Sequence, residues 1–253
     1  RMFMDRRFAR QSLSGQERVN RHKALLYFGA QNPEVVKLEF DSLPSERVIY
    51  DPQTAGKDTV ALWFDLPAEE LPDTIKGTIT FFKHDSINNL VESTDKLRLA
   101  WVKKETKEEQ KEREKQEKER ERAEKAGEEY VPPTPPNPFK VTMATSGELN
   151  KDRHIDMEFD FPLTRFDSAA ITLREVRDGS QDTTNVEFHF VQDTLNRRKY
   201  QLRAKWEAKA KYELMMPAGV FANVAQEQND TLKYNYTGSD PEQYALINVK
   251  VRS

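Results

Sequence analysis

Residues 154–161 read HIDMEFDF, and this stretch decides the fold. Ile155, Met157 and Phe159 alternate with acidic residues, so the polarity of the side chain changes at every step. Successive side chains of a β-strand point to opposite faces of the sheet, and a period of two therefore indicates one face in a core and one in water. The stretch predicts a half-buried strand of an antiparallel sheet.

The same alternation returns through the second half of the chain. Further apolar or alternating runs lie at 171–176, 186–191, 200–206, 212–216, 232–236 and 245–251. Turn sequences separate them, such as PAG at 217–219 and GSDP at 238–241. Many short strands without an amphipathic helix predict an antiparallel sandwich over residues 138–253, and the strand at 244–251 could open a further domain.

The first half carries a looser version of this pattern. Strand-like runs occupy 24–28, 35–40, 59–66, 75–83 and 97–101, whereas residues 1–20 show no clear strand pattern. In the second run we expect Val36, Leu38 and Phe40 to share the buried face. Residues 1–102 are therefore expected to form a more divergent β-sandwich.

Residues 103–129 break the alternation, because 21 of these 27 residues are charged. Their Lys, Glu and Arg residues are good helix formers, and pairs such as Glu114 and Lys118 have the favourable i,i+4 order. The segment offers no apolar stripe for a coiled coil. Two interpretations fit: a helical spacer of roughly 40 Å at 1.5 Å per residue, or a partly disordered insertion. With the proline-rich residues 131–138, it makes 103–137 a linker.

Composition narrows the classes of function. The net charge of −3 gives no support for nucleic-acid binding, and the basic clusters at 6–7 and 197–199 are short and flanked by acids. No apolar run is long enough to span a membrane, and residues 1–10 lack the apolar core of a signal peptide. Cysteine is absent, which excludes disulfides and thiolate chemistry.

The second half also resembles a known family. Residues 154–163, ending in Phe-Pro-Leu, are similar to the alternating strand of bacterial Ig-like domains of the SbsA type. Ile171-Thr172-Leu173 resembles the next strand of that family, and 211–221 looks like its later Tyr-x-Leu and Gly-Val strand. At 222–227 the chain departs from the family's Asp-x-x-Gly-Asn loop.

Residues 71–74, 78–81 and 84–89 resemble the closing part of the same unit, which makes the first domain a divergent copy. The resemblance implies two antiparallel immunoglobulin-like β-sandwich domains. It also implies a surface protein or lipoprotein of Gram-negative anaerobes, in the cell surface or periplasm and associated with the outer membrane, with any lipid anchor outside this chain. Families of this type serve mainly as structural or adhesive modules.

The chain lacks the common catalytic and nucleotide-binding motifs. The chain has no Gly-x-Gly-x-x-Gly, P-loop, Gly-x-Ser-x-Gly or His-Glu-x-x-His sequence. The sharpest metal candidate is the row His154, Asp156 and Glu158, but residues at that spacing lie roughly 7 Å apart and a single ion could not join all three. The solvated face of a strand is the favoured interpretation, as it is for Glu187 with His189.

Two further stretches or groupings have residue types that suit a site. Residues 178–182 (DGSQD) hint at a calcium loop but fail the EF-hand pattern, and a hairpin turn is favoured. A convergent pair of carboxylates for hydrolysis is a remote alternative, since no pair stands out among 43 acids. We therefore assign no catalytic, cofactor-binding or metal-binding residue and expect no cofactor.

The tryptophans separate the remaining hypotheses. Trp101 and Trp206 continue apolar alternations and are expected in the cores. Trp63 lies opposite the apolar face of its strand, so it either packs between the domains, which is favoured, or forms an exposed ligand platform with Phe82. The sequence thus predicts a non-enzymatic spacer or scaffold with an unknown protein or glycan partner, and a glycan- or peptide-binding sandwich as the alternative.

Overall fold

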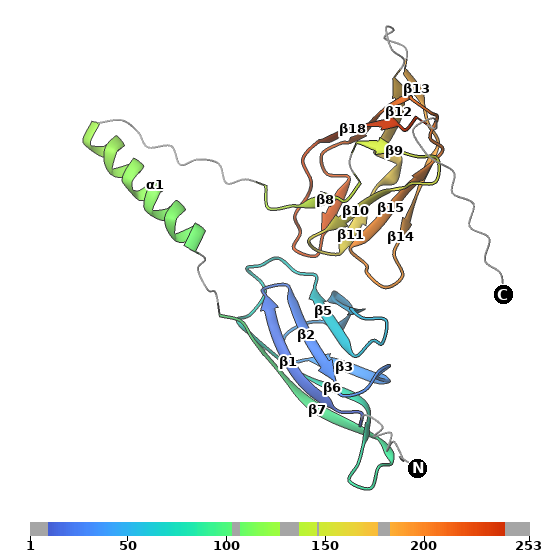
Figure 1. The fold of residues 1–253 in the computed structure, drawn as a ribbon. Helices are drawn as coiled ribbons and strands as arrows, with labels where there is room; N and C mark the ends of the chain where they lie inside the picture. Colours follow the sequence, from blue (N-terminus) through green and yellow to red (C-terminus); the bar gives the residue numbers. More distant parts are fainter. Residues whose placement is uncertain (1–9, 103–106, 127–136, 146, 177–182, 241–253) are drawn as a thin grey trace, which may run out of the picture.

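The computed structural model describes residues 10–102, 107–126, 137–145, 147–176 and 183–240. They form two β-sandwiches and one helix that stands apart from both (Figure 1). The predictions for residues 6–7, 131–136, 178–182 and 244–251 lie outside the described residues. The predicted fold of antiparallel β-sandwiches is confirmed, and of the two interpretations of the charged segment the structure shows the helix.

The first sandwich consists of seven strands in two antiparallel sheets. One sheet has the order β1-β2-β5-β4 and the other the order β3-β6-β7. The strands are β1 (Leu13–Asn20), β2 (Lys23–Phe28), β3 (Val35–Phe40), β4 (Val48–Pro52), β5 (Thr59–Phe64), β6 (Thr74–His84) and β7 (Leu90–Ala100). In chain order these are the ABED and CFG sheets of a constant-type immunoglobulin domain.

Two expectations for this sandwich were wrong. Residues 13–20 form the edge strand β1, although their polar sequence shows little alternation. Val36 is 52% exposed rather than buried, because a register shift between Val35 and Lys37 adds a residue to β3 against β6. Such a bulge reverses the alternation beyond it, so Val35 joins Leu38 and Phe40 against the core.

The second sandwich has a four-stranded sheet, β14-β15-β10-β8, and a five-stranded sheet, β13-β12-β16-β18-β9. The first consists of β8 (Val141–Met143), β10 (Ile155–Phe159), β14 (Phe188–Gln192) and β15 (Lys199–Ala204). The second consists of β9 (Glu148–Leu149), β12 (Thr172–Val176), β13 (Thr183–Asn185), β16 (Lys211–Met216) and β18 (Leu232–Gly238). A small pair of β11 (Leu163–Phe166) and β17 (Phe221–Asn223) completes it. Apart from the parallel pair β9 and β18, all pairings are antiparallel, and the order is again immunoglobulin-like.

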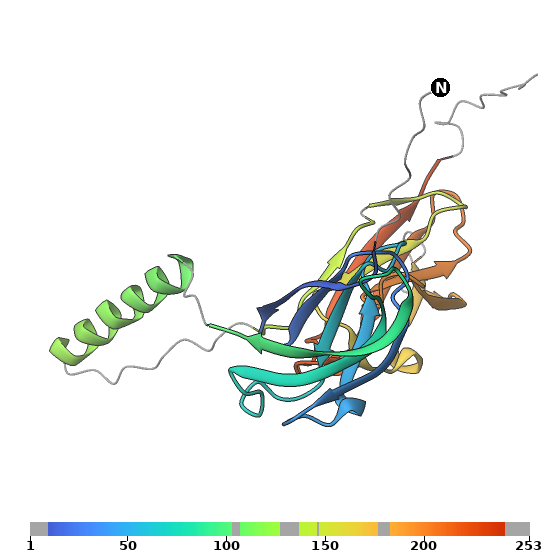
Figure 2. The ribbon, with the colours of Figure 1, turned by 90° about the horizontal axis from the view of Figure 1, so that it is seen from below.

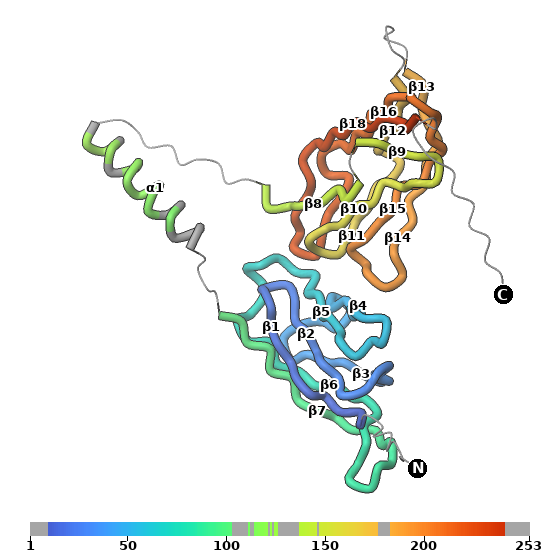
Figure 3. The backbone as a smooth tube through the Cα atoms, viewed as in Figure 1, coloured from blue at the N-terminus to red at the C-terminus, as the bar shows by residue number. Residues whose placement is uncertain are grey.

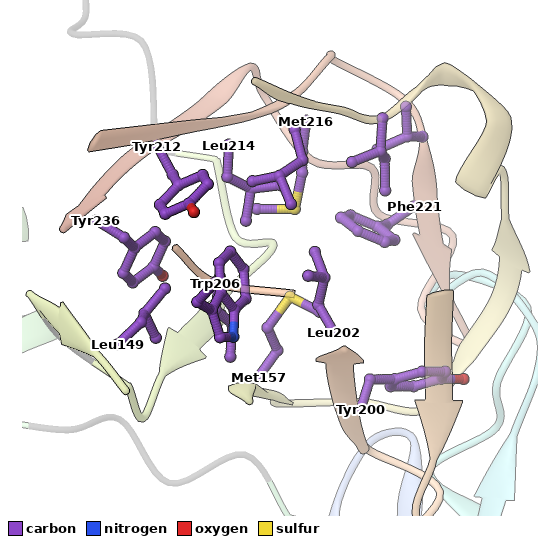
Figure 4. Packing of buried hydrophobic residues seen from close by; sticks show 14 of the residues in the cluster. Leu149, Met157, Tyr200, Leu202, Trp206, Tyr212, Leu214, Met216, Phe221 and Tyr236 are labelled. Atoms are coloured by element: carbon purple, nitrogen blue, oxygen red, sulfur yellow. The ribbon is translucent and has the colours of Figure 1, made fainter. Parts of the chain in front are cut away.

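The core of the second sandwich is aromatic and sulfur-rich (Figure 4). Ile155, Met157 and Phe159, the residues that predicted the strand, are all buried in it. Trp206 packs edge-to-face on Tyr212, whose hydroxyl accepts a 2.6 Å hydrogen bond from the backbone N–H of Glu207. A tyrosine that bonds back to the chain before its own strand resembles the tyrosine corner of immunoglobulin domains.

The core prediction for Trp101 was wrong, whereas that for Trp206 is confirmed. Trp101 is half-buried outside the apolar clusters, with the Arg21 guanidinium 5.1 Å from its ring centroid. It follows the end of β7, where the sheet no longer covers it.

The charged segment forms α1 (Lys107–Ala126), as one of the two interpretations predicted. Lys115 and Glu119 make an ion pair along it at 4.0 Å. None of its described residues enters an apolar cluster, and it projects away from both sandwiches in two perpendicular views (Figure 2). It does not hold the domains apart, since the two sandwiches touch directly.

Candidate functional site

The two sandwiches meet at a small apolar cluster, which we call the domain junction. It is built on Ala61, Trp63 and Val224, with Leu25, Ile49 and Phe161 packed against them. Trp63 lies on the face of β5 that points away from the first core, and it is only 1% exposed. Its ring meets Phe161 of the second sandwich edge-to-face at 5.9 Å. Trp63 therefore packs between domains, as favoured, and it cannot act as an exposed ligand platform.

Polar contacts fix the Trp63 ring in the junction. The indole Nε1 donates to Oδ2 of Asp51 at 3.1 Å, and that carboxylate is itself buried. The Lys23 ammonium lies 4.8 Å from one ring centroid of Trp63, and the Arg198 guanidinium of the second sandwich lies at 6.0 Å. Cations near an indole face are attracted by its quadrupole, so Arg198 ties the two domains together. Burial, followed by the charge of Arg198, lowers the pKa of Lys23.

Two hydrogen bonds and an aromatic contact surround this cluster. Gln226 Nε2 donates to Oδ1 of Asp65 across the junction at 2.7 Å. His22 is 6% exposed, and its Nδ1 lies 3.2 Å from the carbonyl oxygen of Phe64. The imidazole also meets Phe161 edge-to-face at 5.8 Å. Burial lowers the pKa of His22, which favours the neutral ring that donates from Nδ1.

Arg18 reinforces the first sandwich next to His22. Its guanidinium donates to the carbonyl oxygens of Pro72 and Arg21, both at 2.7 Å, and lies over the Phe64 ring. Burial lowers the pKa of Arg18 to about 10. The group remains charged at neutral pH and acts as a structural clamp between strand ends.

The predicted row His154, Asp156 and Glu158 does not act as one site. Asp156 accepts a 3.0 Å hydrogen bond from Gln201 Nε2 on the neighbouring strand. Glu158 pairs with Arg198 at 3.0 Å, which connects the row to the domain junction. Within the described part of the chain, no three His, Cys, Asp or Glu side chains are placed to hold a metal ion.

His154 instead takes part in an open pocket of about 1010 Å³ in the second sandwich. We call it the β14 pocket. Its polar lining comes from His154, Ser168, Glu187, His189, Arg203 and Lys205, and its apolar lining from Ile171, Val186 and Phe188 with two alanines. The structure thus brings together His154 and the Glu187–His189 pair, which the sequence presented as separate rows.

Strand register explains this meeting. His189 pairs with Arg203 between β14 and β15, and Ile155 pairs with Leu202 between β15 and β10. His154, Arg203 and His189 therefore lie at the same level on three adjacent strands. Sequence reasoning missed Arg203 and Lys205, because nothing in their own strand marks them. Only the pairing of 186–191 with 200–206 could have shown that they join the histidines.

Among the described residues that line this pocket, Glu187 is the one carboxylate. Glycoside hydrolysis usually needs two carboxyl groups facing one another across the substrate. The described lining supplies one of these two groups, and it has more basic than acidic side chains around an apolar floor.

No protein-family profile and no curated protein matches the chain. Among solved structures, it is similar to the four N-terminal Ig domains of Dscam1 isoform 9.44, with zinc, at 8% identity and a TM-score of 0.22. It is also similar to those of Dscam1 isoform 4.44, at 10% identity and a TM-score of 0.23. The matches cover 92% of this chain and 51% and 53% of those chains, about half their length. None of the helices in the described residues is both long and apolar enough to cross a bilayer. The Ig-like fold itself rests on the strand order of the two sandwiches.

Proposed function

We propose that this chain is a non-enzymatic interaction module of a cell-surface or periplasmic protein, in which the two Ig-like sandwiches act as one scaffold. The observation that carries the proposal is the domain junction, where Trp63 is buried against Phe161 and Arg198 of the other sandwich. A buried tryptophan with a hydrogen bond and two cations holds a mutual orientation that flexible linkers do not provide. The resemblance of the second sandwich to SbsA-type domains supports the extracytoplasmic location.

In this proposal, the two sandwiches joined at the domain junction act as the spacer, and the helix α1 does not. The sandwiches together form a bent body with loops and sheet edges available to a partner (Figure 1). Surfaces contributed by both domains would keep their relative positions as long as the junction is closed. The function therefore depends on orientation rather than on a reaction centre.

The test is photo-crosslinking of the whole chain, with a label on each sandwich, in the envelope fraction of the organism that produces it. We expect a defined set of partners that labels on both domains capture. Phe161→Ala, which removes the ring against Trp63, should reduce the two-domain capture, while Leu195→Ala, an exposed apolar residue of the same sandwich, should not.

Catalytic activity of the purified chain would contradict the proposal of a non-enzymatic module. Hydrolysis of an envelope glycan, ester or peptide by the purified chain that Glu187→Gln abolishes would replace the proposal with an enzyme centred on the β14 pocket. Capture that is unchanged in Phe161→Ala would retain an interaction module but remove the role of the junction.

A further inference from the structure

Strand β14 is the edge of its sheet. It pairs with β15 on one side, and within the described residues no strand covers its other side (Figure 3). The backbone N–H of Asp193 donates to the carbonyl oxygen of Lys199 on β15 at 2.9 Å. Because hydrogen-bonded and non-bonded pairs alternate along an antiparallel ladder, the N–H groups of Phe188 and Phe190 point away from β15. The edge therefore presents backbone donors to an incoming chain.

The β14 pocket lies along this edge and has a divided chemical character. Glu187, His189 and Phe188 of the edge segment all line it. Pairing puts Phe188 and Phe190 on the inner face with Leu202, and leaves His189 and Arg203 on the outer face. An added strand would meet apolar side chains on its inner side and polar, mainly basic ones on its outer side.

Arg203 is held in place for such a role. Its Nη2 donates to Oε1 of Gln201 at 2.8 Å, and Gln201 Nε2 donates to Asp156 at 3.0 Å. This chain of side chains fixes the guanidinium, which makes no ion pair with a carboxylate of the described residues. Arg203 Nε and His154 Nδ1 are buried and have no hydrogen-bond partner, although buried polar atoms are normally satisfied. Both atoms belong to residues that line the pocket.

We propose that the edge of β14 and the β14 pocket bind an extended, acidic peptide segment of a partner protein by strand addition. Main-chain hydrogen bonds to Phe188 and Phe190 supply the affinity. Carboxylates on the outer side of the added strand meet Arg203, Lys205 and the two histidines. These basic side chains outnumber Glu187, the one acidic side chain among the described lining residues. Apolar residues on its inner side extend the floor at Val186 and Phe188. This inference rests on the proposed function as an interaction module and names the partner chemistry.

The probe is a short acetylated and amidated peptide of alternating Glu and Val, titrated into the whole chain by calorimetry. We expect binding with slower hydrogen exchange at the amides of Phe188 and Phe190. Lys205→Glu, an exposed position, should weaken binding about tenfold. Lys233→Glu, exposed on β18 of the opposite sheet, is the matched control and should leave it unchanged.

Four results would overturn the proposal. One is equal binding of the same peptide with methylated backbone nitrogens, since strand addition needs its N–H groups. Another is binding of an alternating Lys-Val peptide with the same affinity as the Glu-Val probe. A third is displacement of the probe by an acidic oligosaccharide that binds with the same affinity. The last is failure of the Glu-Val peptide to bind at all. Because the pocket belongs to the second sandwich alone, Phe161→Ala should bind the peptide normally, so loss of this site and loss of the two-domain function give different results.

Discussion

At the scale of single residues, His22 brings a titratable ring into the surface where the sandwiches meet. Burial lowers its pKa below the ordinary value of 6.5, and the nearby charges of Arg18 and Arg21 act in the same direction. Above pH 6.5 the ring is neutral in both the folded and the unfolded chain. As the pH falls below that value, the unfolded chain takes up a proton that the folded one resists, so the free energy of unfolding decreases towards the lowered pKa.

We therefore expect the wild-type chain to lose stability from this group by up to about 1.4 kcal/mol per pH unit below pH 6.5. His22→Gln retains a side-chain donor but cannot titrate, and its denaturant unfolding should depend less on pH in this range. His189→Gln, an exposed histidine, serves as the control. An identical pH dependence in the wild type and His22→Gln would contradict the assignment.

At the scale of elements, α1 illustrates a helix that needs no core. Its lysines, arginines and glutamates give good intrinsic helix propensity, and Lys115 pairs with Glu119 along it. In the described residues it contributes nothing to the apolar clusters. Its stability is thus independent of the sandwiches, and theirs of it.

Replacing residues 107–126 by a Gly-Ser segment of equal length should remove the helical circular-dichroism signal but leave the thermal midpoint of the sandwiches within about 2 °C. High salt should weaken the helix of the wild type while it spares the sheets, because exposed ion pairs are screened. A clear fall in the midpoint after the replacement would show that α1 packs on a sandwich.

The strands show which local patterns predict structure and which do not. In β10 the alternation of Ile155, Met157 and Phe159 is strict, and the buried face follows the sequence. In β3 a single bulge exposes Val36, because pairing with β6 rather than local alternation determines which residue is extra. Strand β1 escapes prediction for a related reason: as a sheet edge it buries few apolar residues.

At the scale of the whole molecule, the junction decides the shape. Phe161 contributes two edge-to-face contacts, with His22 and Trp63, and each such contact is worth about 0.5–1.5 kcal/mol. Phe161→Ala should therefore loosen the junction without unfolding either sandwich. Small-angle scattering should show a radius of gyration larger by a few ångströms and a broader distance distribution. Leu195→Ala, on an exposed loop of the same sandwich, is the control and should scatter like the wild type. A wild-type scattering curve for Phe161→Ala would contradict the prediction, because it would show that other contacts hold the domains together.

The candidate sites belong to this larger scale as well. The sequence identified His154, Glu187, His189 and Trp63 as residues to weigh, but it could not show their neighbours. Trp63 needed Phe161, about a hundred positions away, to become a buried contact, and His154 needed Arg203 on the next strand to become part of a pocket.

By itself, the amino-acid sequence determined the two β-rich regions, the charged segment of good helix formers between them and the faces of the regular strands. These follow from the period of polarity and from helix propensity, which act between near neighbours. Only the tertiary structure decided the sheet order, the bulge in β3, the contact of the sandwiches and the membership of the β14 pocket. Strand pairing and domain packing join residues far apart in the chain, and no local pattern of polarity states which strand lies beside which.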